Sequence, residues 1–193
     1  MTLLLAGLVL FLGVHSVAIV APAARESLRL RLGEGGWKGI YSILSLAGFA
    51  AICYGFGLAR QSPVVLYVPP PWMRHVTMLL MLPVFPLLFA ANLPGRIRTA
   101  TKHPMLAGVK LWAFAHLLAN GRLADVVLFG AFLAWAVVDR ISMKRRPAQG
   151  VRDLPTRPWN DAAAVALGLA TYALFILWAH VRLFGVAPMG HSF

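Results

Sequence analysis

The chain has 193 residues, of which 60% are hydrophobic and only 12% are charged, compared with about 25% charged residues in an average soluble domain. Its formal net charge is +12, but the basic residues stand in short loops between apolar runs, which argues against a nucleic-acid-binding protein. This composition excludes a soluble globular domain and predicts an integral membrane protein whose main partner is the lipid bilayer.

Six apolar segments follow one another along the chain. They cover residues 2–21, 39–59, 76–94, 104–119, 123–139 and 162–183. We therefore predict an all-α, polytopic bundle of about six transmembrane helices, in a single domain over residues 1–193. The first segment lacks the positively charged start of a secretory signal, so we expect it to be retained as a helix.

The fourth and fifth segments, 104–119 and 123–139, are the shortest. As helices of about 16 residues they would be about 24 Å long, less than the hydrocarbon core of about 30 Å. Only residues 120–122 join them. We expect them to form a short helical hairpin.

Prolines predict two interruptions. Residues 67–75, YVPPPWMRH, contain three consecutive prolines and predict a non-helical loop at the membrane surface, anchored by Tyr67 and Trp72. Pro83 and Pro86 lie inside the third segment and predict a kink there.

Lysine and arginine predict the orientation. Thirteen of the 18 lie in the loops after segments one, three and five, whereas four lie on the opposite side. The positive-inside rule places the first set of loops in the cytoplasm and both termini on the other side. For the basic connector 139–159 two interpretations stay open, a plain orientation signal or contact with anionic head groups.

Histidines inside apolar segments are the main candidates for a functional site, because ionisable residues are rare there. His15 and His116 lie deepest, about 9 Å and about 18 Å from the cytoplasmic ends of their segments at 1.5 Å per residue. Imidazole suits iron, zinc or copper, and two imidazoles from different helices are what bis-axial ligation of a heme requires. His180 and His103 are secondary metal candidates. Alternatively, each histidine only bonds a carbonyl or a serine of a neighbouring helix.

Three residues near His116 extend this candidate site. Trp112 and Asn120 stand four residues before and after it and share its helical face, so that the indole could line a flat cofactor and the amide could orient a ring nitrogen or a nearby polar group. Lys110 lies near the cytoplasmic end of the same segment. Its ammonium group either reaches lipid phosphate or binds a cofactor propionate.

Two long blocks of the sequence carry a family resemblance. Residues 33–56, GEGGWKGIYSILSLAGFAAICYGF, and residues 92–146, which include KHPMLAGVKLWAFAHLLANG, resemble the NnrU family of bacterial integral membrane proteins. The similarity runs from FLGVHS at 11–16 to HVRLFGVAP at 180–188. It implies a multi-pass protein of the bacterial inner membrane, whose termini the charge count then places in the periplasm.

The resemblance also implies a function. NnrU proteins are associated with denitrification, the reduction of nitrite and nitric oxide, and the same family contains the plastid 15-cis-zeta-carotene isomerase, a heme b enzyme. Carried over by motif, its heme-ligating histidines correspond to His15 and His116. A cysteine that precedes the second of them is replaced here by Ala113, so a thiolate ligand is not available at that position.

Three hypotheses follow, and they leave open whether the protein is an enzyme. The first is a heme-b-binding protein that supports denitrification, with nitric oxide as a candidate ligand. The second is a heme-dependent cis-trans isomerase of a carotenoid-like or isoprenoid substrate, a hydrophobic small molecule that would enter from lipid. The third is a cofactor-free membrane assembly or regulatory protein.

Overall fold

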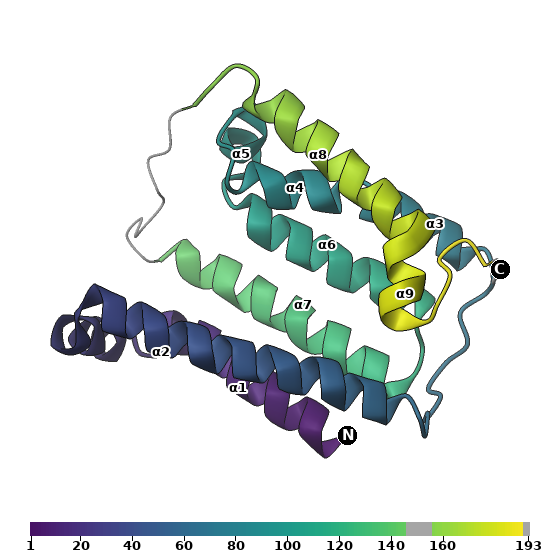
Figure 1. Ribbon diagram of the computed structural model, residues 1–193, viewed down its shortest axis with the longest axis horizontal. Coiled ribbons are helices and arrows are strands. Elements are labelled where there is room, and N and C mark those ends of the chain that lie inside the picture. The colour runs from purple at the N-terminus through teal and green to yellow at the C-terminus, as the bar shows by residue number, and fades with distance from the viewer. Residues whose placement is uncertain (146–155, 191–193) are drawn as a thin grey trace. The chain divides into compact units, whose positions relative to one another are not determined.

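The computed structural model describes residues 1–145 and 156–190, and helices dominate both ranges (Figure 1). The elements in chain order are α1 Thr2–Val20, α2 Pro22–Ala59, α3 Met73–Met81, α4 Val84–Ala90, α5 Arg96–Thr101, α6 Pro104–Ala119, α7 Leu123–Met143, α8 Asn160–Leu174, the π-helix η1 Phe175–Ala179 and α9 His180–Phe184. Within the described residues, five helical stretches are long and apolar enough to span a membrane, and α6 is a shorter apolar helix. This confirms the predicted all-α, multi-pass membrane fold.

Helix α2 begins much earlier than the predicted segment 39–59. Pro22 occupies its first turn, where the missing N–H group costs nothing, and the following charged residues are good helix formers. The single non-helical position is Gly33, with φ of 71°, a left-handed conformation that glycine adopts without steric cost. The first connector is therefore a helix with one kink and not a loop.

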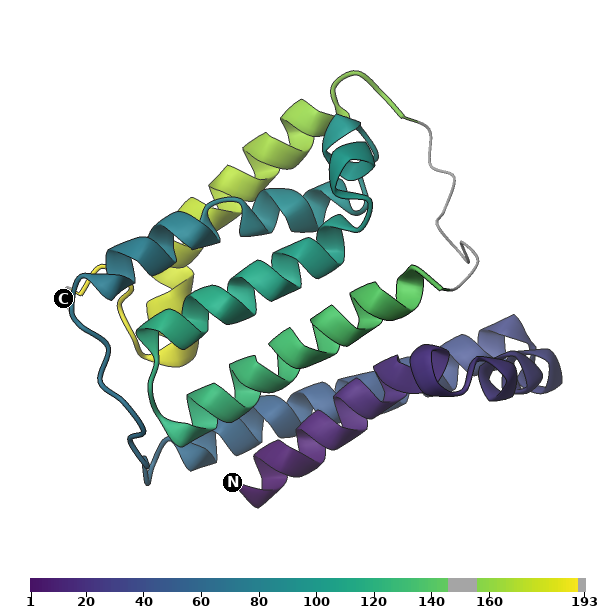
Figure 2. The same ribbon diagram turned by 180° about the vertical axis from the view of Figure 1, so that it is seen from behind.

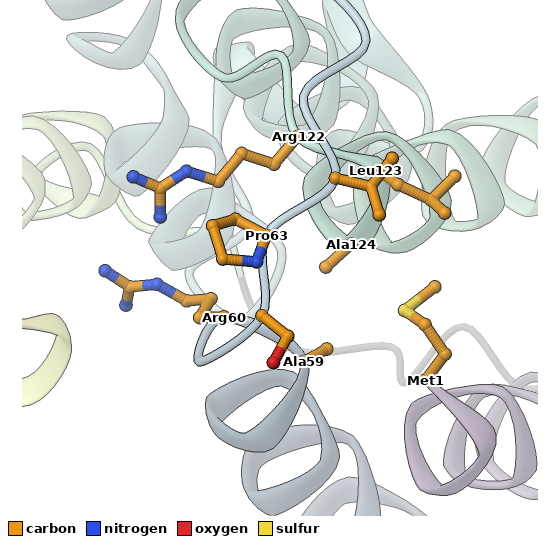
Figure 3. A pocket seen from close by; sticks show the side chains of 9 residues that line it. Met1, Ala59, Arg60, Pro63, Arg122, Leu123 and Ala124 are labelled. Atoms are coloured by element: carbon orange, nitrogen blue, oxygen red, sulfur yellow. The ribbon is translucent and has the colours of Figure 1, made fainter.

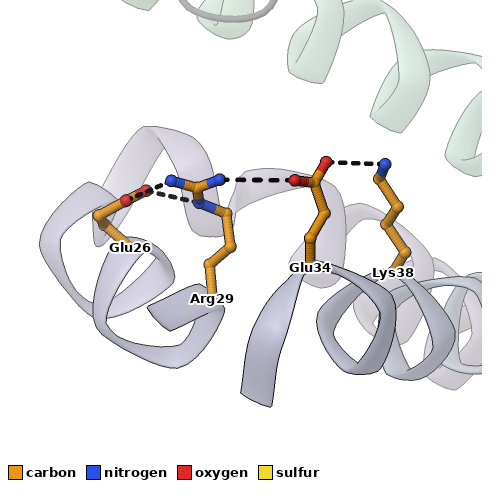
Figure 4. Close-up of polar contacts among 4 residues, drawn as sticks. All are labelled: Glu26, Arg29, Glu34 and Lys38. Carbon is orange, nitrogen blue, oxygen red and sulfur yellow. Dashed lines mark hydrogen bonds and ion pairs between the residues drawn. The ribbon is translucent and has the colours of Figure 1, made fainter. Parts of the chain in front are cut away.

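An ion-pair network crosses this kink (Figure 4). Arg29 pairs with Glu26 at 2.7 Å and approaches Glu34 at 3.9 Å, and Lys38 pairs with Glu34 at 2.8 Å. The hydrogen bond from Lys38 and its positive charge lower the pKa of the exposed Glu34 carboxyl. Exposed pairs of this kind contribute little to stability. The network therefore links the side chains before and after Gly33 without adding much to the free energy of unfolding.

The prediction for the fifth segment was wrong in length. Helix α6 has 16 residues, as predicted for the fourth segment, but α7 has 21 and ends at Met143, so that its length of about 31 Å suffices for the hydrocarbon core. The apolar run ends at Asp139 and Arg140, but charged residues do not stop a helix. Residues 120–122 connect the two helices, as predicted.

The predicted kink in the third segment is confirmed, because the segment is divided into α3 and α4 at Leu82 and Pro83. The non-helical loop predicted over 67–75 is confirmed for residues 67–72 only, since α3 already begins at Met73. The connector 139–159 is described only in part, because its residues 146–155 lie outside the described ranges. His191, at the end of the sequence, also lies outside them.

Two compact units divide the described helices. One unit contains residues 1–67 and 122–142, with α1, α2 and α7, and the other contains residues 68–121 and 143–193, with the remaining helices. We call them the first and the second unit and describe each by itself. The single domain expected over 1–193 stays a prediction.

Glycines set the packing of the first unit. Figure 2 shows α1 lying along α2, and a side chain at Gly7, Gly48 or Gly55 would collide with the backbone of the opposite helix. Gly48 lies against Phe11 and Gly55 against Leu4, which makes the pair antiparallel. Close approach of backbones at small residues is a common source of helix association in lipid, where the hydrophobic effect does not drive it.

The second unit combines a glycine contact with interhelical hydrogen bonds. Gly168 of α8 lies against the backbone of Pro86 in α4. At the proline break Leu82 donates to Leu79, so the carbonyl of Met78 is left for the Tyr172 hydroxyl at 2.8 Å. The break in the third segment thereby provides an acceptor that ties α8 to α3.

The start of α8 also holds the start of α5. The Asp161 carboxylate accepts the backbone N–H groups of Arg96 at 2.8 Å and Ile97 at 3.1 Å, and the Asn160 amide donates to Pro94 at 2.8 Å. A side chain at Gly95 would collide with this carboxylate. Asp161 thus caps a helix that has no side-chain cap from its own N-cap residue.

Replacing Asp161 with alanine should lower the free energy of unfolding by about 1–2 kcal/mol, the usual effect of losing a helix cap. Asp161→Asn keeps one acceptor oxygen and should lose less. Reversible unfolding in mixed detergent micelles measures both. Equal stability of the alanine variant and the wild type would contradict the capping role.

Large apolar side chains cover the outside of the helices. On α2, for example, the exposed fractions of Ile43, Leu46 and Tyr54 are 68%, 67% and 67%. A soluble protein rarely exposes so much contiguous apolar surface. These faces contact the acyl chains of a bilayer.

Candidate functional site

His15 lies on α1 among aromatic side chains of the first unit. Its ring stacks on Phe11 with a centroid distance of 4.2 Å, meets Trp135 of α7 edge-on at 6.0 Å and lies 5.3 Å from the Tyr41 ring of α2. The antiparallel contact of Phe11 with Gly48 explains the neighbours on α2, because His15 then stands one turn further along, at the level of Leu44, and Tyr41 lies one turn beyond Leu44. Three helices therefore supply the surroundings of this histidine.

A hydrogen bond fixes the tautomer of His15. Its Nδ1 lies 2.7 Å from the carbonyl oxygen of Phe11, and since a carbonyl can only accept, Nδ1 carries the proton. In the neutral ring Nε2 then carries the lone pair. Histidines that bind metals show this arrangement, in which the second nitrogen donates to a carbonyl or carboxylate.

His116 has the same local arrangement on α6. Its Nδ1 lies 2.9 Å from the carbonyl oxygen of Trp112, and the Trp112 ring lies 5.5 Å from the imidazole. In both helices, then, an aromatic residue four positions before the histidine provides a ring contact and the carbonyl acceptor. The Thr77 hydroxyl donates to Ala115 at 2.9 Å, which fixes α6 against α3 next to His116.

The other predicted site residues also lie in the second unit. The Asn120 amide donates to the backbone carbonyl of His116 at 2.8 Å, which closes the helix end, and Lys110 is half-buried on α6. His103 is the N-cap residue of α6. His180 bonds the Val186 carbonyl at 2.7 Å and lies close enough to His116 for an electrostatic interaction.

The structure brings together some predicted residues and separates others by unit. Trp112, His116 and Asn120 form one stripe, as predicted, with His180 near His116, whereas His15 belongs to the first unit. Residues 1–145 and 156–190 contain no group of three or more histidine, cysteine, aspartate or glutamate side chains that could hold a metal ion. Axial ligation of a heme needs no such group.

An unpaired donor near His15 fits a cofactor. The indole Nε1 of Trp135 is buried, and the described part of the chain provides no hydrogen-bond acceptor for it. An unpaired buried N–H group is costly, and a cofactor carboxylate such as a propionate would satisfy it. The aromatic walls and the Nδ1 proton of His15 fit a planar metal cofactor as well.

Sequence analysis missed Tyr41 and Trp135. Both are amphipathic side chains inside apolar segments, with Ser45 and Asp139 four residues further along the same helices, and Asp139 is buried with an exposed fraction of 8%. Polar residues at four-residue spacing in two lipid-spanning segments were therefore a usable signal.

A family model described as NnrU protein matches residues 3–188, almost the whole chain. The chain belongs to the NnrU family. No curated protein matches it, and no solved structure does.

Proposed function

We propose that this NnrU protein binds heme b, which His15 and His116 would hold, and that it supports the reduction of nitrite and nitric oxide in the bacterial inner membrane. The observation that carries the heme proposal is the shared arrangement of the two histidines. Each ring contacts an aromatic residue four positions earlier and has Nδ1 within 2.9 Å of that residue's carbonyl oxygen. The respiratory role rests on the family resemblance.

The residues of the chain have separate tasks in this proposal. The carbonyl groups of Phe11 and Trp112 hold the imidazoles in the tautomer that presents Nε2, which favours metal ligation. The Trp135 indole supplies a buried donor for a carboxylate, and the rings of Phe11, Tyr41 and Trp135 lie against the His15 imidazole. When bound, the heme would supply one-electron chemistry or a binding site for nitric oxide.

The isomerase alternative keeps the same ligands. Ala113, in the position of the isomerase's cysteine, is completely buried on α6, so this chain has no thiol there to exchange with a histidine. That difference favours a role in nitrogen-oxide reduction over polyene isomerisation. The cofactor-free hypothesis requires His15 and His116 to act only in packing.

A complementation assay tests the proposed role. In a denitrifying host that lacks its own NnrU protein, wild type should restore nitric oxide consumption, whereas the double variant His15→Ala/His116→Ala should lose most of it at equal protein level. Full restoration by the double variant would contradict a heme-dependent role. Conversion of poly-cis carotenoids in a pigment-producing host would favour the isomerase.

A further inference from the structure

Two arginines lie together at the end of the first unit that contains Met1. After α2 ends at Ala59, the chain returns to the start of α7, where the Leu123 N–H donates to the Val64 carbonyl at 2.8 Å and Val65 pairs with Arg122 in an antiparallel bridge. Figure 3 shows the Arg60 and Arg122 side chains extending in the same direction on either side of Pro63. They adjoin a hollow of about 20 Å³ that is lined by Met1, Pro63, Val64 and Leu123.

The charges at this end are unequal. The nearby carboxylate is Asp125, which is buried with an exposed fraction of 6% and accepts the backbone N–H of Arg122 at 3.3 Å. Both guanidinium groups interact electrostatically with Asp125, and since two positive charges stand against the negative charge of this carboxylate, the three side chains together carry a net positive charge. The Arg60 guanidinium also lies over the Phe56 ring, 5.8 Å from its centroid, which restricts its position.

Topology does not explain this pair. The positive-inside rule assigns this end to the non-cytoplasmic side, where basic residues are few. The sequence places four arginines on that side, Arg60, Arg74, Arg122 and Arg182, and two of the four meet here. A cation pair on the side where cations are scarce indicates binding of an anion.

We propose that Arg60 and Arg122 bind the phosphodiester of an anionic phospholipid. Planar guanidinium groups suit phosphate oxygens because they form paired hydrogen bonds. The end of α2 and the start of α7 bound two lipid-spanning helices and therefore lie at head-group level. The hollow has room for about one water molecule, so the phosphate lies at its rim. A head group without an ammonium group is favoured, because two arginines repel a second cation.

Native mass spectrometry of protein from nanodiscs with equal phosphatidylglycerol and phosphatidylcholine tests the proposal. Wild type should retain phosphatidylglycerol preferentially, and Arg60→Gln/Arg122→Gln should retain it at least about tenfold less. A hydrogen bond between charged groups contributes more binding free energy than a bond between neutral groups, and about 1.4 kcal/mol already corresponds to a factor of ten. The matched control is Arg74→Gln/Arg182→Gln, which removes the same charge from the same predicted side. Equal loss in both pairs would overturn the proposal.

Two further arms complete the test. Arg60→Lys/Arg122→Lys keeps the charge and should retain more phosphatidylglycerol than Arg60→Gln/Arg122→Gln. If circular dichroism shows that the glutamine variant is unfolded, the lysine variant takes its place in the test. Lipid selectivity of the lysine variant equal to that of the wild type would then overturn the role of the paired guanidinium hydrogen bonds. Millimolar inorganic phosphate should leave the lipid bound. Displacement of the lipid by phosphate would overturn the lipid as ligand in favour of the free ion.

Discussion

Alanine at His15 or at His116 should lower the affinity of the purified protein for hemin by at least about tenfold, because each substitution removes one metal–imidazole bond and about 1.4 kcal/mol already corresponds to a factor of ten. The spectrum should also lose the features of a heme with two histidine ligands. Titration with hemin, followed at the Soret band, measures both effects.

Two controls separate ligation from packing. His75 lies in the first turn of α3 and is exposed. His75→Ala should therefore bind hemin like the wild type. Added imidazole should restore the two-histidine spectrum of His15→Ala and His116→Ala if these variants are folded. Unchanged spectra in both variants would contradict the assignment and would direct attention to His180 and His103.

Gly55→Ala should lower the free energy of unfolding by about 1–3 kcal/mol, the usual range for overpacking a close contact. The added methyl group would collide with the backbone of Leu3 and Leu4 in α1, and helices α1 and α2 would have to separate along their contact. Because the register of these helices places His15 beside Tyr41, we also expect weaker hemin binding. Reversible unfolding in mixed micelles and the hemin titration provide the two readouts.

Gly57 offers a matched control on the same helix. A methyl group there meets no atom within 4 Å, so Gly57→Ala should gain up to about 1 kcal/mol from helix propensity. If the two variants had the same stability, the glycine contact would not hold α1 against α2.

The sequence predicted helices best where local chemistry marks both ends. Helix α6 matches its predicted bounds because Pro104 occupies its first turn and Asn120 and Gly121 follow its last residue. Hydropathy failed for the first half of α2 and the last turn of α7, since it reports contact with lipid and not helix formation. The sequence of the π-helix η1, FILWA, contains no local pattern that predicts a π-helix. In the structure its Phe175 ring lies 5.1 Å from the Phe85 ring, and such a tertiary contact cannot be read from the local sequence.

The candidate site was predictable along each helix but not between helices. Trp112, His116 and Asn120 share a face because of the helical repeat alone. The neighbours of His15 depend on the register of α1 against α2, which Gly48 and Gly55 set through contacts with the other helix. Two glycines seven residues apart in one apolar segment were the available signal.

The most direct test of the heme proposal is the electron paramagnetic resonance spectrum of the ferric wild-type protein after loading with hemin. The proposal predicts a low-spin signal from one heme per chain, typical of two imidazole ligands. A purely high-spin signal, or no specifically bound heme at saturation, would contradict it.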